Sequence, residues 1–417
     1  MTVDFTPSPR VEALLSRLRA FLEDEVWPHE AAYFAEVRAA CPDDDWRRWR
    51  VSPRMEAWKA RARALGLWNL FLPDAEHGAG LSNVEYAPVA ELLGRVTFAS
   101  EIVNSSAPDT GNMEVLHRYG SPAQQARWLA PLLAGEIRSV FAMTEPEVAS
   151  SDATNMRATA TVRGDRVIVD GHKWWTTGLG HPNAKVAIVM ARTEDAGADR
   201  HHQHSMVLVP LDAPGVRIER MLPVFGEYDA PAGHGEVRFE QVEVSIDDLV
   251  AGPGMGFEIA QGRLGPGRIH HAMRCVGAAE RALELMIDRA ASRTAFGKRL
   301  VDLGGNRERI AEARLAIDQA RLLTLYAAWK LDALGPLGAM TEISAIKVVA
   351  PNVLQRVVDD AIQLFGGLGL SNDAPLVAFH AQARALRLAD GPDEVHRGLI
   401  AKIELAKRGH GRARGEG

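Results

Sequence analysis

The sequence of 417 residues predicts a multi-domain α+β protein in which helices come first, strands second and longer helices third. Three observations predict this order. Apolar residues recur at helical spacings from about residue 10 to residue 138, short β-branched runs follow, and helical spacing then returns. We therefore expect three domains, an α-helical domain at 1–138, a β domain at 139–250 and an α-helical bundle domain at 251–417.

The first segment is rich in Ala, Leu, Arg and Glu. Leu14, Leu18 and Phe21 stand at spacings of three and four, so they lie along one face of a helix. The segment is therefore predicted to be helical.

From about Ser139 the helical spacing of apolar residues gives way to short β-branched runs. The runs at Lys185–Met190, Ser205–Val209 and Glu236–Phe239 are typical of strands. Thr159–Val162 and Arg166–Val169 flank Arg163-Gly164-Asp165, which predicts a hairpin whose glycine supplies a positive φ. Together these pieces predict a β sandwich or barrel.

The third segment follows the glycine-rich stretch 252–256. One face of a long helix is indicated by apolar residues at Ile310, Ala313, Ile317, Ala320 and Ala327. Val357, Ala361 and Leu364 continue the pattern, and Pro351 is expected to kink or interrupt a helix.

Composition excludes several classes of protein. The chain is 47% apolar and 24% charged, without the run of about 18 apolar residues that crosses a bilayer, so we expect no membrane segment. The start lacks the features of a secretory signal, which favours a cytoplasmic protein. A net charge of −6 with both signs interspersed argues against nucleic-acid binding. Cys41 and Cys275 are expected to be core thiols.

The nucleotide-binding motifs G-x-G-x-x-G after a strand and G-x-x-x-x-G-K-[ST] do not occur in the sequence. A dinucleotide would therefore be held by arginines, hydroxyls and backbone amides. Such groups occur in four segments: Phe141–Asp152, Gly171–Gly178, Arg293–Lys298 and Gln363–Gly369. A fifth segment, Ala389–His396, places Asp390 beside a Gly-Pro break.

These segments, in this order, resemble those of the acyl-CoA dehydrogenases over essentially the whole chain. The resemblance implies an N-terminal helical domain, a central β-sandwich or barrel domain and a C-terminal four-helix bundle. It also implies FAD as the cofactor. The segment Phe141–Asp152 would bind the flavin through Phe141, Met143, Thr144 and Ser150, and Ser151 would lie near the CoA chain. The alternative is that this segment forms an ordinary polar turn.

In the second segment, the resemblance implies that Trp175 packs against the flavin and that the Thr177 hydroxyl reaches its N5 atom. Tandem tryptophans are otherwise usually core residues. Arg293 and Phe296 would contact the FAD of a neighbouring subunit, as would Gln363, Gly366 and Gly367. The chain would then form a homodimer or homotetramer. Alternatively, Arg293 is a solvated helix-end residue and the glycines cap a helix.

Asp390 aligns with the position where many of these enzymes keep a glutamate that removes the substrate α proton. Aspartate is one methylene shorter, so this chain resembles a branch of the family with an adapted base. Arg268 would stand beside the carboxylate, Gly267 and Gly391 would contact substrate, and Pro392, Asp393 and Glu394 would line the flavin. The alternative is that Asp390 caps the helix that starts near Pro392.

The resemblance implies dehydrogenation of an acyl-CoA to the 2-enoyl-CoA, with electrons passing to an electron-transferring flavoprotein in fatty acid β-oxidation. Two alternatives stay open. One is a flavin oxidase or monooxygenase of a small carbon acid such as a nitroalkane, and the other is a non-catalytic flavin-binding or CoA-binding scaffold. The cluster His201, His202 and His204 has no acidic partner at ligand spacing, so no metal is expected.

Overall fold

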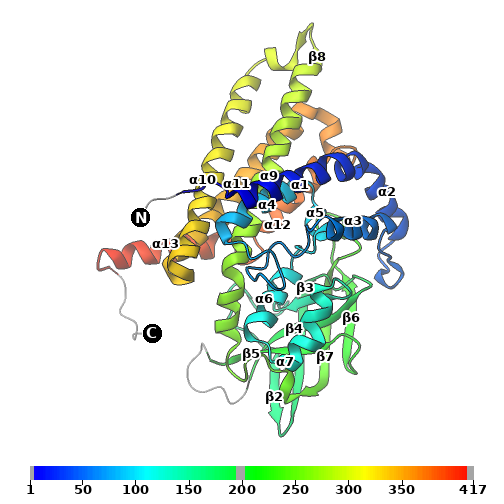
Figure 1. The fold of residues 1–417 in the computed structure, drawn as a ribbon, viewed down its shortest axis with the longest axis vertical. Helices are drawn as coiled ribbons and strands as arrows, with labels where there is room; N and C mark the ends of the chain where they lie inside the picture. Colours follow the sequence, from blue (N-terminus) through cyan, green and yellow to red (C-terminus); the bar gives the residue numbers. More distant parts are fainter. Residues whose placement is uncertain (1–3, 194–201, 411–417) are drawn as a thin grey trace. The chain divides into compact units, whose positions relative to one another are not determined.

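The computed structural model describes residues 4–193 and 202–410. The chain divides into two compact units, which we call the helical unit and the β unit (Figure 1). The helical unit consists of residues 1–27, 80–100 and 265–417, and the β unit consists of residues 28–79 and 101–264. The family-like order of helices, sheet and helices is confirmed. The three domain boundaries given above stay predictions.

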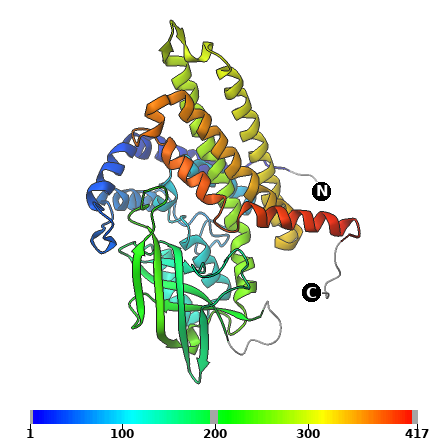
Figure 2. The same ribbon diagram turned by 180° about the vertical axis from the view of Figure 1, so that it is seen from behind.

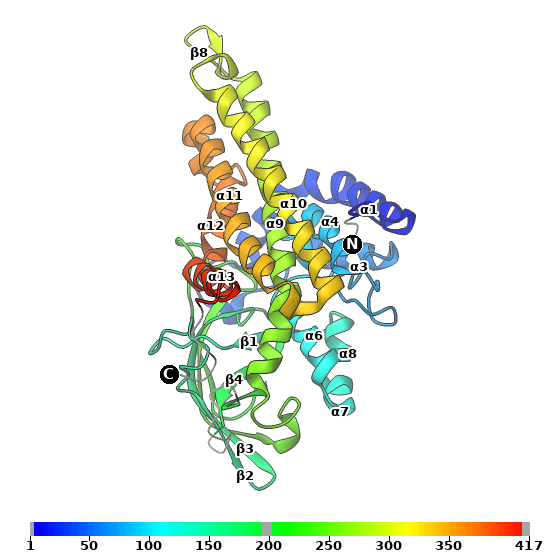
Figure 3. The same ribbon diagram turned by 90° about the vertical axis from the view of Figure 1, so that its left-hand side faces the viewer.

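The helical unit is built from long helices. They are α1 (Pro9–Phe21), α4 (Asn83–Gly94), α9 (Gly256–Ser292, in this unit from Gly265), α10 (Asn306–Gly338), α11 (Met340–Phe365), α12 (Leu376–Leu386) and α13 (Asp393–Lys407). A short hairpin of β8 (Thr294–Ala295) and β9 (Lys298–Arg299) joins α9 to α10 and lies at the far end of both helices (Figure 3). Helix α11 packs against α10, α12 and α13.

The predicted apolar faces form the core of this bundle. Ala313, Ile317, Ala320 and Ala327 of α10 are buried, as are Val357, Ala361 and Leu364 of α11. Helices α4 and α9 cross closely at Gly277, where a Cβ atom would collide with the backbone of Glu91. The bundle core therefore follows the helical periodicity of the sequence.

Pro351 does not interrupt a helix, because α11 runs through it. The break occurs instead at Gly335, where φ is 69° and ψ is 179°, immediately before Pro336 in α10. A residue before proline is pushed out of the helical region, and glycine adopts a positive φ without steric cost. A proline inside a helix loses one backbone hydrogen bond and crowds the preceding turn, and Pro351 lies on the buried face of α11.

The β unit contains one mixed sheet of seven strands in the order β1-β4-β2-β3-β7-β6, with β5 paired to β4 (Figure 2). The strands are β1 (Arg138–Ala142), β2 (Thr159–Arg163), β3 (Arg166–Thr177), β4 (Ala184–Arg192), β5 (His204–Pro210), β6 (Val216–Met221) and β7 (His234–Ser245). Every predicted strand is present, and Gly164 turns the β2–β3 hairpin at a φ of 61°.

Helices α2 (Glu30–Ala40), α3 (Pro53–Ala64), α6 (Asp109–Tyr119), α7 (Pro122–Gln124) and α8 (Ala130–Leu133) also belong to the β unit, and the four-residue helix α5 (Ala99–Ile102) lies at its boundary. The sheet core is made by small and β-branched side chains such as Val140, Val189 and Val209, with Phe239 and Trp49. Cys41 packs partly buried against this core, whereas Cys275 is fully buried in the helical unit.

A buried ion-pair network lies beside the start of β1. Arg138 is bonded to Asp109 and lies 2.7 Å from Glu101, which also pairs with Lys59 at 2.9 Å. Burial alone raises the pKa of Glu101, but the Arg138 and Lys59 charges hold it well below its usual value. Each buried charge therefore has a partner.

Across residues 4–193 and 202–410, none of the helices combines the length and apolar character needed for a membrane crossing.

Candidate functional site

Asp390 lies at a sharp break between α12 and α13. The backbone adopts φ 55° at Asp390 and 99° at Gly391, conformations that L residues rarely adopt. The Asp390 side chain is 24% exposed. The N-cap position of α13 is Pro392, so Asp390 does not cap that helix. A strained break with a partly exposed carboxylate favours a functional role.

Two side chains hold the peptide group of Asp390. Arg268, in the interior of α9, donates from Nη2 to the Asp390 carbonyl oxygen at 3.1 Å, and His396 donates from Nε2 to the same oxygen at 3.2 Å. Burial lowers the pKa of Arg268, although Asp390 opposes the shift. Burial also lowers the pKa of His396 to about 4. His396 is therefore neutral at pH 7 and carries its proton on Nε2.

Lys347 of α11 anchors the residues on both sides of the break. Its ammonium is buried, is bonded to the carbonyl oxygen of Leu386 and lies 3.3 Å from that of Gly391. Burial lowers the pKa of Lys347, whereas the Asp390 charge raises it. The loop from α12 to α13 is therefore fixed by three cationic or donor side chains from α9, α11 and α13.

His271 faces the Asp390 carboxylate, with Nε2 3.6 Å from Oδ2. Its Nδ1 lies 3.4 Å from Nη2 of Arg274. A guanidinium can only donate, so Nδ1 accepts and the imidazole proton belongs on Nε2, toward Asp390. The sequence pattern did not single out His271, because this contact joins α9 to a residue 119 positions away. Its neighbour His270 is buried against Tyr86.

The residues after the break have distinct environments. Asp393 is buried, with Arg387 at 2.9 Å and Asn352 at 3.1 Å from Oδ2. Glu394 is exposed. A Cβ on Gly391 would approach Nε2 of His396 at 3.0 Å, so this position favours glycine. The predicted flavin roles of Pro392, Asp393 and Glu394 stay predictions.

The β unit holds the predicted flavin loop through one buried ion pair. After β1, Glu145 accepts from Nζ of Lys173 at 2.8 Å and from the backbone N–H groups of Arg157 and Ala158. Burial alone raises the pKa of Glu145, but Lys173 and the two amides lower it. Lys173 also donates to the carbonyl oxygen of Met143 at 2.9 Å. These bonds define the backbone course around Met143 and Thr144.

Within the same loop, the Ser150 hydroxyl accepts from the N–H of Glu145 at 2.9 Å. Ser151 is exposed, and Asp152 Oδ1 accepts from the N–H and hydroxyl of Thr154. Phe141 is partly buried on β1. The loop thus contains polar turns, as the alternative interpretation predicts. Ser151 lies at the surface.

Strand β3 bulges at the tandem tryptophans. The pairing of β3 with β7 shifts register between Lys173 and Thr176, and Trp175 adopts φ 52° with 41% of its surface exposed. The backbone N–H of Trp174 donates to the carbonyl oxygen of Thr144 at 3.0 Å, which ties the bulge to the predicted flavin loop. Bulges re-aim side chains near active sites, and a bulky residue at positive φ is rare.

Thr177 follows the bulge and pairs directly with His234 of β7. Its Oγ1 forms a hydrogen bond of 3.0 Å with Nδ1 of His234, whose ring also faces Trp175 with centroids 5.9 Å apart. Nothing in the sequence pattern singled out His234, because the contact depends on strand pairing across 57 residues.

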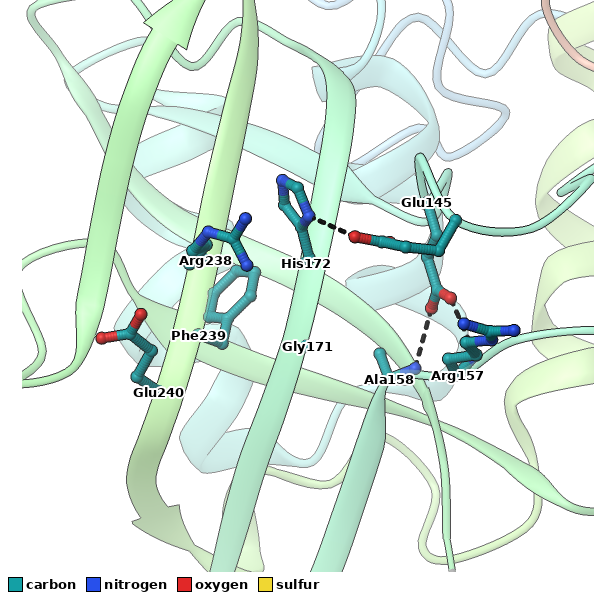
Figure 4. A pocket seen from close by; sticks show the side chains of 9 residues that line it. Glu145, Arg157, Ala158, Gly171, His172, Arg238, Phe239 and Glu240 are labelled. Atoms are coloured by element: carbon teal, nitrogen blue, oxygen red, sulfur yellow. Dashed lines mark hydrogen bonds and ion pairs between the residues drawn. The ribbon is translucent and has the colours of Figure 1, made fainter.

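A pocket of about 280 Å³ also lies in the β unit (Figure 4). It is lined by Glu145, Glu147, Arg157, Ala158, Gly171, His172, Arg238, Phe239 and Glu240. His172 lies between two carboxylates, with Glu147 at 2.6 Å from Nδ1 and Glu236 at 2.7 Å from Nε2. These contacts link the predicted flavin loop to β7.

The two segments predicted to meet a neighbouring subunit lie at one end of the bundle. Arg293 follows α9 and is exposed, and Phe296 at the tip of the β8–β9 hairpin is 96% exposed. Gly366 caps α11 at φ 67°, and added Cβ atoms at Gly366 and Gly367 would meet open space. Arg289 of α9 donates to the carbonyl oxygen of Phe365 at 3.4 Å, so the ends of α9 and α11 are joined.

The histidine cluster is described only in part, because His201 lies outside the described residues. Over the part of the chain that the structure describes, no group of three or more His, Cys, Asp or Glu side chains is arranged for a metal ion.

Comparisons with known proteins cover nearly the whole chain. Family models match as Acyl-CoA dehydrogenase, N-terminal domain at residues 8–136, middle domain at 140–242 and C-terminal domain at 254–405. The mouse protein acyl-CoA dehydrogenase family member 10 is 53% identical over 403 residues, which is 95% of this chain and 37% of the relative. The Mycobacterium tuberculosis protein named probable acyl-CoA dehydrogenase FadE2 is 49% identical over 97% of this chain and 98% of its own length.

A solved structure from Mycobacterium abscessus, whose name assigns it to the acyl-CoA dehydrogenases, has a TM-score of 0.94 and 59% identity. It covers 97% of this chain and 100% of its own. The chain spans only 37% to 51% of the length of the vertebrate relatives it matches, in contrast to the mycobacterial relative.

Helices, a mixed sheet and a second set of helices define a flavin-dependent dehydrogenase fold. The chain belongs to the acyl-CoA dehydrogenase family. Members of this family are FAD-dependent oxidoreductases that bind acyl-CoA, and FAD is the family's cofactor.

Proposed function

We propose that the chain dehydrogenates an acyl-CoA thioester to the 2-enoyl-CoA, with Asp390 as the base that removes the α proton. The observation that carries the proposal is the geometry at Asp390. A partly exposed carboxylate stands on a strained break whose carbonyl is held by Arg268 and His396. Strain and fixed orientation at one carboxylate are typical of a catalytic group.

The residues of the chain fit FAD. Trp175 offers an exposed indole on a bulge, which suits stacking on a flat conjugated ring. Arg293 is an exposed planar fork, and the open backbone at Gly366 and Gly367 would let amides approach phosphate oxygens. When bound, the flavin supplies the acceptor for the hydride that leaves the β carbon. We assign flavin contacts also to Phe141, Met143, Thr144, Ser150 and Thr177, and substrate contacts to Ser151, Gly267 and Gly391.

The proton step belongs to the helical unit. A bound acyl chain would remove water from Asp390 and so raise its pKa, which improves its match to a weak carbon acid. Arg268, His271 and Lys347 place positive charge or N–H donors around the break and oppose that shift in the free enzyme. Because aspartate is one methylene shorter than glutamate, these anchors also compensate by fixing where the carboxylate starts.

We further propose that the chain works as a homodimer or homotetramer in which Arg293, Phe296, Gln363, Gly366 and Gly367 contact the FAD of a neighbouring subunit. The exposure of Phe296 supports this assignment, because its ring is accessible to a neighbouring subunit. An electron-transferring flavoprotein as acceptor, a role in fatty acid β-oxidation and a cytoplasmic location are part of the same proposal.

The test is anaerobic mixing of the yellow FAD-loaded protein with a panel of acyl-CoA thioesters of increasing chain length. The proposal expects loss of the flavin absorbance with at least one thioester and formation of the 2-enoyl-CoA in equal amount. A protein that binds FAD but stays oxidised with every thioester contradicts it.

The same flavoprotein mixed with small nitroalkanes in air tests the oxidase alternative. Consumption of oxygen with a nitroalkane, and no bleaching by thioesters, would favour an oxidase. Binding of CoA or FAD without either reaction would favour a non-catalytic scaffold.

A further inference from the structure

His234 was not part of any motif, yet it contacts two residues that the proposed function places at the flavin. It faces Thr177 across the β3–β7 pairing and bonds its hydroxyl at 3.0 Å. Its ring lies beside Trp175, at an interplanar angle of 50°. The His234 side chain is 19% exposed, so these contacts hold it largely out of water.

The bulge at Trp175 makes this arrangement possible. Continued without a shift, the pairing of Lys173 with Val237 would place Thr176, and not Thr177, opposite His234. The register shift between Lys173 and Thr176, with Trp175 at φ 52°, restores pairing so that Thr176 meets Gly235 and Thr177 meets His234. The hydrogen bond of Thr177 is therefore built into the sheet.

The pairing decides what the Thr177 hydroxyl can offer to a third group. A threonine hydroxyl has one proton and two lone pairs. If Nδ1 of His234 carries a proton, it donates to Oγ1 and leaves the hydroxyl proton free to donate elsewhere. If Nδ1 carries no proton, the Thr177 hydroxyl donates its proton to His234 and can only accept a hydrogen bond from a third group.

The contact of Nε2, on the other side of the His234 ring, limits the possible protonation states of the imidazole. Nε2 of His234 lies 3.6 Å from Oδ2 of Asp229, an ion-pair distance that favours a proton on Nε2. The two compatible forms are the imidazolium, which frees the Thr177 proton, and the Nε2–H tautomer, which leaves Thr177 as an acceptor. A flavin nitrogen that accepts a hydrogen bond when oxidised would suit the first form. One that donates a hydrogen bond when reduced would suit the second.

We propose that His234 is a positioning residue that orients the Thr177 hydroxyl toward the flavin and thereby sets the reduction potential of the cofactor. The inference rests on the proposed function, because it takes the contact of Thr177 with the flavin from it. His234 acts through Thr177, so its effect depends on that hydroxyl.

The experiment compares the FAD-loaded wild-type protein with His234→Phe, Thr177→Val and the double variant. His234→Phe keeps an aromatic ring beside Trp175 and removes the hydrogen bond. Thr161→Val on β2 is the matched control, since it makes the same change in the same sheet. The readouts are FAD stoichiometry, melting temperature and the two-electron midpoint potential of the bound flavin, measured by dye equilibration.

We expect His234→Phe to change the ratio of affinities for oxidised and reduced flavin by about tenfold, which is a shift of about 30 mV for a two-electron couple. The double variant should match Thr177→Val alone, because the two residues act as one unit. Thr161→Val should leave the potential unchanged. If His234→Phe does not fold, His234→Leu, which also removes the hydrogen bond to Thr177, replaces it with the same expectation.

An unchanged potential in His234→Phe together with a shifted potential in Thr177→Val overturns the role of His234 and leaves the flavin site intact. Unchanged potentials in both variants overturn the inference and also the assignment of Thr177. A protein that binds no FAD overturns the proposed function itself.

Discussion

Arg268 donates its Nη2 proton to the backbone carbonyl oxygen of Asp390, 3.1 Å away, and so holds the peptide group of the proposed base. The two residues are 122 positions apart, on α9 and on the break before α13. The contact fixes the backbone from which a short carboxylate must reach its substrate. An arginine beside the base was predicted from the sequence, but its hold on the carbonyl was not.

Replacing Arg268 by Met is expected to slow flavin reduction by an acyl-CoA on the order of a hundredfold, because a shift of about 1 Å in a reacting group has that effect. Stopped-flow absorbance under anaerobic conditions measures the rate. The control is Arg397→Met, which removes an exposed arginine of α13. A rate equal to that of the wild type in Arg268→Met would remove the arginine from the account.

His396 should make stability fall in acid. Its folded pKa of about 4 lies below the unfolded value near 6.5, so the unfolded chain binds the proton more readily. The contribution of His396 to the free energy of unfolding is then fully present above pH 6.5. The free energy of unfolding declines by up to ~3 kcal/mol as the pH falls to 4. Urea unfolding at several pH values, compared with His396→Gln, measures this contribution.

Gln retains an N–H donor for the Asp390 carbonyl but does not titrate. The buried His270, whose pKa is also lowered, contributes equally to both proteins. Identical acid sensitivity in the two proteins would show that His396 is not the titrating group.

Gly366 and Gly367 form a matched pair. An added Cβ meets open space at both positions, but only Gly366 has a positive φ, of 67°. Gly366→Ala is expected to destabilise the fold by about 1–3 kcal/mol through backbone strain, whereas Gly367→Ala should change it by less than about 1 kcal/mol. Thermal or chemical denaturation of both variants decides, and equal losses would exclude the strain.

Arg138 should be essential for stability. Its replacement by Met leaves Asp109 without the guanidinium that it contacts and leaves Glu101 with Lys59, which is expected to cost about 3–5 kcal/mol. Arg217→Met, at an exposed arginine of β6, should cost less than about 1 kcal/mol. A similar small loss in both variants, measured by urea unfolding, would indicate that Arg138 is dispensable.

The order of helices and strands could be predicted from the sequence because it depends on local periodicity. The apolar face of α10 and the β2–β3 hairpin at Gly164 are examples. The predicted interruption at Pro351 was wrong, since α11 continues through it and the non-helical residue is Gly335 in α10. The break in α10 combines a proline with a preceding glycine that adopts a positive φ, and apolar periodicity does not report this combination.

The position of Asp390 and Gly391 at a break between helices could be predicted, because both residues belong to one motif. Partners from distant elements could not, and Lys347, His271 and His234 are the examples. Lys347 carried a usable signal, because a lysine between Ile343, Ile346 and Ala350 on a buried face needs partners. His234 carried none, because its contact with Thr177 depends on strand register.

The Asp390 carboxylate is proposed to remove the α proton of the substrate. The most direct measurement is the rate at which a reactive acyl-CoA bleaches the flavin of Asp390→Asn without oxygen, at FAD content equal to the wild type. The variant keeps the size of the side chain and the bonds to the Asp390 carbonyl, so we expect FAD to bind and bleaching to fall by at least about a thousandfold. Bleaching at the wild-type rate would contradict the account.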